Sequence, residues 1–191
     1  MTVRCLLLLG LCALLLQGCF DVRTPEPPAP AAGGWTPPTD PEILLDNFRR
    51  ATADLNLVNY ERCFDAATFR FTPDPDVLGN NLGLFQEWSL IDELEYLKNI
   101  QEASASTEQN RLELRRIAPD TYLTPDSLVY VADYTLTVTH QNEEELPFTF
   151  EGNINLTLRF RDNEWAISQW QDNQTGTEPC WTELKQYFIV D

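Results

Sequence analysis

The chain has 191 residues, and its 43% hydrophobic and 11% aromatic content is enough for one folded domain with accessory segments. Thirty acidic side chains against 13 basic ones give a formal net charge of -17 at pH 7. This charge repels phosphate backbones and anionic membrane surfaces, so we expect no nucleic-acid partner. The closest basic groups are two arginine pairs, at 49–50 and 115–116, which are typical of a solvated surface.

The first eighteen residues have the pattern of a targeting segment. Arg4 provides a short positive start, and residues 6–16 are apolar apart from Gly10. This run is shorter than the roughly 20 residues that a helix needs to span a bilayer. The alternative is a buried amphipathic helix, but the run is apolar on every face and a proline-rich tract follows it. We therefore expect residues 1–18 to be a signal peptide.

Residues 16–19 read Leu-Gln-Gly-Cys, which resembles the lipobox of bacterial lipoproteins. The resemblance implies that a diacylglycerol is attached to Cys19, that the chain is cleaved before this cysteine, and that the new amino terminus is acylated, with palmitate as a typical chain. Gln17 departs from the small or aliphatic residue usual in the family. Several acyl chains hold a protein firmly, because each buried methylene contributes about 0.8 kcal/mol. We therefore expect Cys19 to anchor the mature chain in a membrane.

The same resemblance implies a location in the bacterial cell envelope. In a host with two membranes, Phe20 directly after the cysteine resembles the pattern of lipoproteins that are sent on to the outer membrane, although Asp21 follows one residue later. We expect the outer membrane rather than the inner one in such a host.

Two cysteines, Cys63 and Cys180, remain once the signal peptide is removed and Cys19 is lipidated. An envelope compartment can oxidise thiols, so the two could form a disulfide. This bridge would close a loop of more than 100 residues, which is worth on the order of 4 to 5 kcal/mol in the chain-entropy treatment. Alternatively, both are separate buried thiols that act as small hydrophobic side chains. Both alternatives stay open, because the sequence does not show whether the sulfurs meet.

Residues 19–39 contain the anchor cysteine and a tether rich in proline, alanine and glycine. Such a composition favours extended polyproline stretches and leaves little to bury. At about 3.1 Å per residue, some 20 residues could hold a domain up to roughly 60 Å from the lipid surface. Trp35 is the exception in this tract, and we expect its large ring to dock on the domain rather than at the lipid interface.

A single domain is predicted over residues 40–191. Thr39 or Asp40 can cap a first helix, which has Pro41 at its start and apolar residues at three- and four-residue spacing up to Leu55. The next expected elements are a short helix, a short strand and a long helix, over 57–64, 67–72 and 84–102. The hydrophobic period then changes to two, which predicts strands over 110–117, 128–139, 148–160 and 165–172. A short closing helix is expected over 179–188.

This order predicts an α+β fold with an antiparallel sheet covered by helices on one face. The order resembles the nuclear-transport-factor-two-like family, also called cystatin-like or SnoaL-like, across residues 40–175. The features that carry the resemblance are the Phe48 helix and its short follower ending at Cys63-Phe64, the Phe69 strand, the Trp88 helix and the closing strand from Trp165 to Asp172. The segment 180–185 has no required counterpart in the family.

The resemblance implies a cone, in which a curved sheet of four long strands and one short strand wraps round the three N-terminal helices. It also implies a cavity between sheet and helices, which some members use for steroid- or polyketide-like catalysis and many others for binding or association. The aromatic residues expected to line this cavity are Phe69, Trp88, Tyr130, Tyr134, Phe148 and Trp170.

The resulting prediction is a non-catalytic binding or interaction module without a cofactor, whose cavity holds an apolar ligand or a side chain of a protein partner. The outer face of the sheet is where family members pair. Val129 and Val131 would lie there and favour a strand, so a homodimer could form through this face.

The alternative is an isomerase- or cyclase-like enzyme that uses a cavity carboxylate opposite a tyrosine. Residues of the right types are Asp74, Asp133, Tyr60, Tyr130 and Tyr134. Asp133 should face away from Tyr130 and Tyr134, because successive residues of a strand point to opposite faces. The single histidine, His140, is expected to be exposed at the end of a strand, and no nucleophile motif accompanies it.

A metal site is not predicted. Residues 172–178 have a calcium-like composition, but their carboxylates do not occupy the positions that an EF-hand uses. Residues 143–145 are three glutamates in an expected hairpin connection, where like charges usually serve solvation and edge protection. One histidine and two cysteines cannot supply four clustered ligands for zinc.

Overall fold

A computed structural model of the chain describes residues 34–77, 79 and 83–190. The predicted signal peptide, Cys19 and most of the predicted tether lie outside these residues. The helices are α2 (Pro41–Ala53), α3 (Leu57–Glu61), α4 (Leu90–Ala103) and α5 (Trp181–Val190). The strands are β1 (Arg70–Thr72), β2 (Arg111–Arg116), β3 (Thr121–Thr124), β4 (Ser127–Thr137), β5 (Thr149–Arg161) and β6 (Glu164–Asn173).

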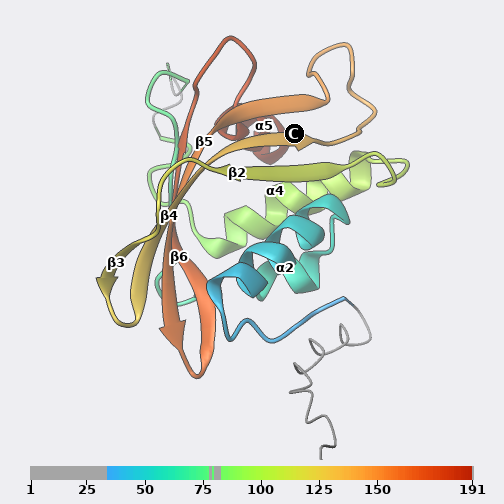
Figure 1. The fold of residues 1–191 in the computed structure, drawn as a ribbon. Coiled ribbons are helices and arrows are strands. Elements are labelled where there is room, and N and C mark those ends of the chain that lie inside the picture. Colours follow the sequence, from blue (N-terminus) through green and yellow to red (C-terminus); the bar gives the residue numbers. More distant parts are fainter. Residues whose placement is uncertain (1–33, 78, 80–82, 191) are drawn as a thin grey trace, which may run out of the picture.

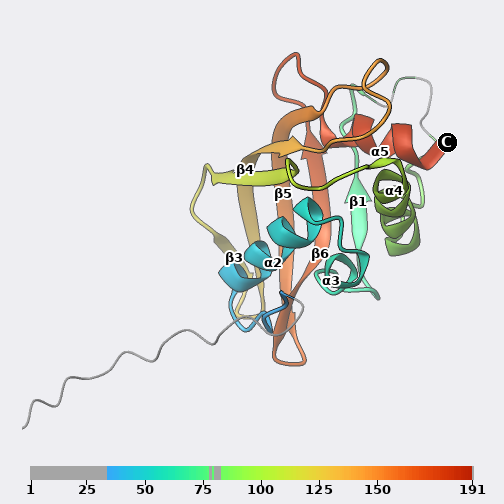
Figure 2. The same ribbon diagram turned by 90° about the vertical axis from the view of Figure 1, so that its right-hand side faces the viewer.

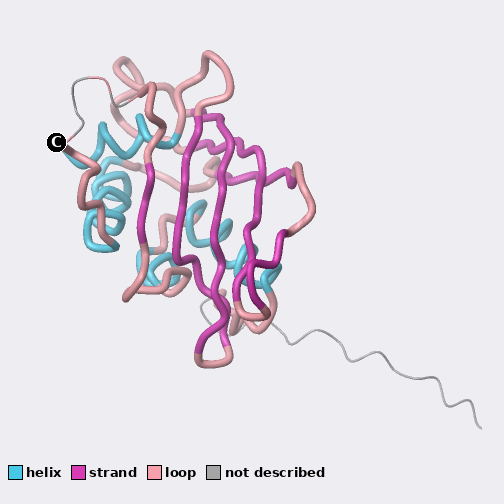
Figure 3. The backbone as a smooth tube through the Cα atoms, turned by 90° about the vertical axis from the view of Figure 1, so that its left-hand side faces the viewer, coloured by secondary structure: helices cyan, strands magenta, loops and turns pink. Residues whose placement is uncertain are grey.

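The strands form one curved sheet in the order β1-β6-β5-β4-β2, with β3 also paired to β4 (Figure 1). The helices pack on one face of this sheet. Figure 3 views the sheet from its other face, with the helices behind the strands. The long strands are antiparallel neighbours, as predicted, while β1 runs parallel to β6 with Phe71 opposite Trp170. The predicted α+β class, with helices on one face of a curved sheet, is therefore confirmed.

The start of the long helix and the number of strands differ from the sequence prediction, each for a local reason. The long helix begins at Leu90 rather than at residue 84, because Ser89 and Asp92 form a capping box in which the Ser89 N–H donates to Asp92 Oδ2 at 2.8 Å. Strand β3 was not predicted, since all four of its residues are exposed and it has no buried-exposed alternation. The sheet consequently has six strands instead of five.

The first helix follows the predicted capping pattern. The side chain of Asp40 accepts a hydrogen bond from the Glu42 N–H at 2.8 Å, and Pro41 occupies the first turn. The helix buries Phe48 against the sheet, and the chain turns at Leu55, whose φ is 49°. This turn places α3 beside α4 (Figure 2).

The segment before α2 is docked on the domain. The Trp35 side chain is only 4% exposed, and the guanidinium of Arg62 lies 4.2 Å from the centroid of its ring. The side chain of Asn47 donates to the Thr36 carbonyl at 2.6 Å, and the Trp165 N–H donates to the Pro38 carbonyl at 2.7 Å. The prediction that Trp35 docks on the domain is confirmed, and ordered contacts begin before the predicted domain start at residue 40.

The C-terminal helix packs between α4 and the sheet. Its first residue, Trp181, is fully buried, with ring centroids 4.5 Å from Trp170, 5.3 Å from Tyr134 and 6.0 Å from Phe48. The Phe188 carbonyl near the other end of α5 accepts a hydrogen bond from the Asn99 side chain of α4 at 2.6 Å. Helix α5 is therefore a part of the hydrophobic core between α4 and the sheet. Within the described ranges, no helix is long and apolar enough to cross a bilayer.

Candidate functional site

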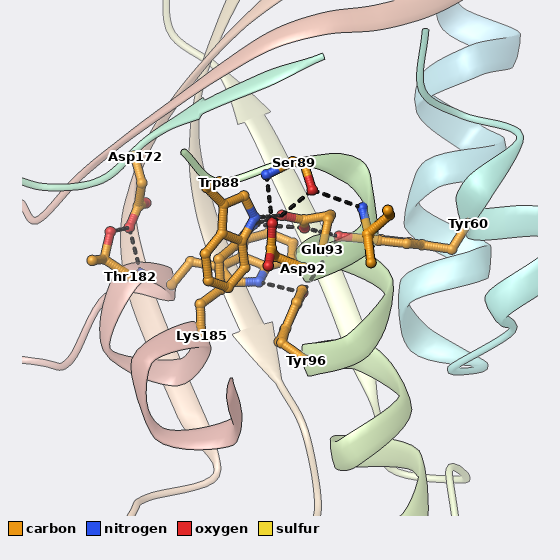
Figure 4. Close-up of polar contacts among 11 residues, drawn as sticks. Tyr60, Trp88, Ser89, Asp92, Glu93, Tyr96, Asp172, Thr182 and Lys185 are labelled. Carbon is orange, nitrogen blue, oxygen red and sulfur yellow. Dashed lines mark hydrogen bonds and ion pairs between the residues drawn. The ribbon is translucent and has the colours of Figure 1, made fainter. Parts of the chain in front are cut away.

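The polar centre of the cone is the carboxylate of Glu93, which α4 places fully inside the core. The Lys185 ammonium on α5 donates to both of its oxygens, at 2.6 Å to Oε1. The Tyr60 hydroxyl donates to Oε1 and the Trp88 indole N–H to Oε2, each at 2.7 Å (Figure 4). These four hydrogen bonds use the acceptor capacity of a carboxylate. Glu93 is therefore a saturated buried anion.

Aromatic rings surround the cation of this pair. The Lys185 Nζ atom lies 3.7 Å from the ring centroid of Trp170, 3.8 Å from that of Phe71 and 5.0 Å from that of Tyr96. Such contacts stabilise an ammonium away from water. Burial nevertheless lowers the pKa of Lys185 to about 8, with the charge of Glu93 acting in the opposite direction.

A second buried carboxylate, Asp172 on β6, holds the first turn of α5. It accepts hydrogen bonds from the Tyr134 hydroxyl at 2.8 Å and from both the N–H and the hydroxyl of Thr182 at 2.7 Å. The Tyr134 oxygen in turn accepts the Trp181 N–H at 2.6 Å. Burial raises the pKa of Asp172 and of Tyr134. Gly152 makes room for this contact, because a Cβ there would lie 2.7 Å from the Tyr134 hydroxyl oxygen.

Sequence reasoning missed Glu93, Lys185 and Asp172, although two of them carry a readable signal. Glu93 occupies an inward position of α4, in register with the buried residues Tyr96 and Ile100. Lys185 occupies an inward position of α5, four residues after the buried Trp181. Opposite charges at inward positions of two helices indicate a buried ion pair, but strands β2 to β6 separate the two helices in the sequence.

The predicted lining residues occupy the expected region but pack against other side chains. Phe69, Trp88, Tyr130, Tyr134 and Trp170 are buried, while Phe148 is half-buried near the sheet end. The interior that the resemblance assigned to a cavity is occupied by α5, through Trp181 and Lys185. The residues that fill the centre of the cone are Phe48, Tyr60, Tyr96, Trp170 and Trp181, all fully buried.

The predicted catalytic carboxylates do not meet the predicted tyrosines. Asp133 points to the outer face, where it pairs with Arg115, so the expectation that it faces away from Tyr130 and Tyr134 is confirmed. Asp74 is buried, but its oxygens accept backbone N–H groups, including that of Gln174 at 2.7 Å. The other predicted tyrosine, Tyr60, pairs with Glu93. Asp74 therefore organises loops, and Asp133 belongs to the surface.

His140 is buried, and the prediction that it is exposed was wrong. The side chain is 6% exposed, between Phe148 and Phe188, whose ring centroids lie 5.2 and 5.5 Å away. Burial lowers the pKa of His140. The alternation of β4 continues past its end, so that the histidine occupies an inward position. Over the residues that the structure describes, no group of three or more histidine, cysteine or acidic residues is placed to hold a metal ion.

Both cysteines of the domain are free and buried, which is the alternative of two separate thiols. The Cys63 sulfur donates to the Asn59 carbonyl at 3.3 Å within the second helical segment. Burial raises the pKa of Cys63 and raises that of Cys180 to about 12. Both thiols are therefore protonated and unreactive at neutral pH.

The surface carries hollows outside the filled cone. A hollow of about 660 Å³ on β2, β4 and β5 is lined by charged residues of both signs, including Arg115, Asp133 and Glu151. Another of about 490 Å³ lies on the outer face of the sheet and is lined mostly by threonine, asparagine and glutamine side chains together with Val129. Val129 and Val131 are half-buried on the outer face, and most of the side chains that line this hollow with Val129 are polar. A homodimer through this face stays a prediction.

Comparison with solved structures identifies the fold. A protein from Novosphingobium aromaticivorans proposed to be an aromatic ring hydroxylase has a TM-score of 0.57 at 11% identity, covering 75% of this chain and 92% of that chain. A proposed scytalone dehydratase from the same organism has a TM-score of 0.54 at 9% identity, covering 73% and 89%. An NTF2-like protein of unknown function in nutrient uptake from Rhodospirillum rubrum has a TM-score of 0.50 at 12% identity, covering 72% and 99%.

These likenesses establish a nuclear-transport-factor-two-like fold, in agreement with the resemblance of the element order. At such low identities they show the fold alone. No protein-family model matches the sequence, and no curated protein matches it.

The buried pair predicts a specific stability pattern. Replacement of Lys185 with Met should lower the free energy of unfolding by about 3–5 kcal/mol, because Glu93 is left as an unpaired buried charge. Adding Glu93→Gln should restore part of the loss, since the glutamine is neutral and still accepts from Tyr60. Urea denaturation at pH 7 measures both effects, with Lys98→Met of the exposed Lys98–Glu102 pair as a control that changes stability little. A double variant no more stable than Lys185→Met would contradict the pairing.

The raised thiol pKa values predict slow reaction in the native state. At pH 8, a thiol reagent should leave Cys63 and Cys180 of the folded protein unmodified, because burial keeps both sulfurs protonated and out of reach. After unfolding without a reductant, both cysteines should be alkylated, as peptide mass spectrometry can determine. Recovery of the two cysteine peptides joined to each other would establish the disulfide instead.

Proposed function

We propose that this chain is a lipid-anchored protein of the bacterial cell envelope whose cone domain acts by surface contact with a protein partner, not by turnover in its interior. The observation that carries the proposal is the filled cone. Trp181 and Lys185 of α5 occupy the space between sheet and helices, and both are fully buried. A substrate would have to displace a helix that Asp172, Glu93 and Asn99 hold through hydrogen bonds.

The net charge of the mature chain limits the classes of partner that it can bind. Without residues 1–18 the chain keeps all 30 acidic residues and loses one basic residue, Arg4, so that the net charge becomes 12 minus 30, or -18. Such a surface attracts cationic proteins, does not repel neutral ones and repels anionic polymers, and salt weakens these effects.

Two observations favour the enzyme alternative. Two buried carboxylates contact tyrosine hydroxyls, Glu93 with Tyr60 at 2.7 Å and Asp172 with Tyr134 at 2.8 Å, as an isomerase-like mechanism would need. The names of two fold neighbours, a proposed hydroxylase and a proposed dehydratase, are also those of enzymes. Both carboxylates are 0% exposed and are already held by groups of this chain. This arrangement favours the contact module.

The anchor is tested by the amino terminus of the mature protein. We expect the protein extracted from membranes to begin at Cys19 and to carry the mass of a diacylglycerol and an acyl chain, because residues 16–19 resemble a lipobox. Intact-mass spectrometry measures this, and Cys19→Ser should leave the chain without the added mass and uncleaved before residue 19. An unmodified amino terminus of the wild type would refute the anchor.

The filled cone is tested by comparing the wild type with Trp181→Ala in a thermal-shift screen of apolar ketones and aromatic compounds. The wild type should not be stabilised, whereas the variant, which has lost a buried indole, should be stabilised by a compound that fills the space. The same compounds should not be turned over. Turnover by the wild type that Glu93→Gln or Asp172→Asn abolishes would replace the contact module with the enzyme.

A further inference from the structure

The helical side of the domain carries an apolar groove between α3 and α4. This hollow of about 370 Å³ is lined by Leu57, Val58 and Glu61 of α3 and by Leu94, Glu95 and Lys98 of α4. The two helices lie side by side (Figure 2). Half-buried Leu57 and Leu94 pack on the core and form the apolar floor.

The two most exposed large apolar side chains of the described residues are Val58, which lines this groove, and Ile91, which precedes Leu94 by three residues on α4. Ile91 is 76% exposed and Val58 67%, compared with 61% for Tyr122 on β3. Residues 91, 94, 95 and 98 lie on one face of α4, because they follow the spacing of three, four and seven residues. The core is packed from the opposite face of the helix, by Tyr96 and Leu97. The exposed side chains at 91, 95 and 98 therefore contribute little to the packed core, whereas Leu94 packs on it.

The charges beside the groove are mostly negative. Glu61 and Glu95 line it without an ion pair to any described residue, whereas Lys98 is paired with Glu102 at 3.4 Å. An apolar floor with two unpaired carboxylates at its edge is complementary to an apolar group flanked by cations.

We propose that the α3–α4 groove binds an amphipathic helix of a partner protein, in which an apolar stripe is bordered by lysine or arginine. The proposal rests on the contact function proposed above and names the kind of partner. Main-chain hydrogen bonds of α3 and α4 are used within the helices, so the groove offers side chains and no strand edge, as in helix-in-groove recognition. A second copy of the mature chain, with its net charge of 12 minus 30, or -18, would bring like charges together, and an anionic lipid surface would do the same.

The test uses the full-length protein in a nonionic detergent, with empty micelles as the blank. The probe is an 18-residue peptide with leucine at positions spaced by three and four residues and lysine elsewhere. Fluorescence anisotropy should show binding of this peptide, and weaker binding, by at least about tenfold, of a peptide with the same composition in shuffled order. Binding should weaken as salt is raised.

Variants locate the binding site. Val58→Asp and Ile91→Asp should each weaken binding about tenfold or more, and Glu61→Lys with Glu95→Lys should weaken it and reduce its salt dependence. The matched controls are Tyr122→Asp and Leu123→Asp, which change similarly exposed apolar residues on β3. They should leave the affinity unchanged. Because all these side chains are exposed, the melting midpoint should stay the same and confirm that each variant is folded.

Three outcomes would overturn the groove as the site. The first is equal binding of the shuffled peptide, which would indicate general attraction to an acidic protein. The second is a loss of binding in the β3 variants alone, which would move the contact surface to the sheet edge and leave the contact function intact. The third is a dimer in analytical ultracentrifugation that Ile91→Asp dissociates, which would assign the groove to a second copy. Turnover in the cone would instead refute the proposed function.

Discussion

The ion pair between Glu93 and Lys185 is the constraint on which the rest of the interior depends. Moving two charges out of water costs several kcal/mol per ion, and the attraction between them offsets this only when the remaining polar atoms are also satisfied. Tyr60 and Trp88 meet that condition for Glu93, and aromatic rings meet it for Lys185. A shift of α5 by one residue would leave both charges unpaired. The pair therefore fixes the register of α5 against α4 more than it adds net stability.

The register of α5 determines whether the interior of the cone is a pocket or a packed core. With Lys185 on Glu93, Trp181 lies between the sheet and α2, and Asp172 holds the helix start. The interior that cone-shaped folds can use as a pocket is core in this chain. Under the contact function proposed above, a partner would meet the surface, where the exposed apolar side chains and the unpaired carboxylates of α3 and α4 lie.

Elements whose buried residues recur with a regular period were predicted well from the sequence. Features that depend on a single long-range interaction, or that have no burial pattern, were not predicted. Strands β4 and β5 alternate over their whole length, and both were found with nearly their observed bounds. Strand β3 is exposed throughout and has no pattern to detect. The prediction of the buried site failed for another reason. Glu93 and Lys185 are 92 residues apart in the sequence, and a charged residue of either kind is typical of the solvated face of a helix. Their pairing follows from how the sheet brings α4 and α5 together.

The docking of Trp35 on the domain shortens the predicted tether between a lipid anchor at Cys19 and the domain. Because Trp35 and Thr36 are fixed to the domain, the tether from a lipidated Cys19 would be about 15 residues long instead of about 20, or roughly 45 Å when extended. For a lipid-anchored chain, the volume that the domain can reach would fall steeply with tether length, so its effective concentration near neighbours in the same membrane would rise by roughly one half. A weak groove contact would gain occupancy from this shortening without any new interaction. The indole of Trp35 therefore sets the radius over which an anchored domain of this kind can find a partner.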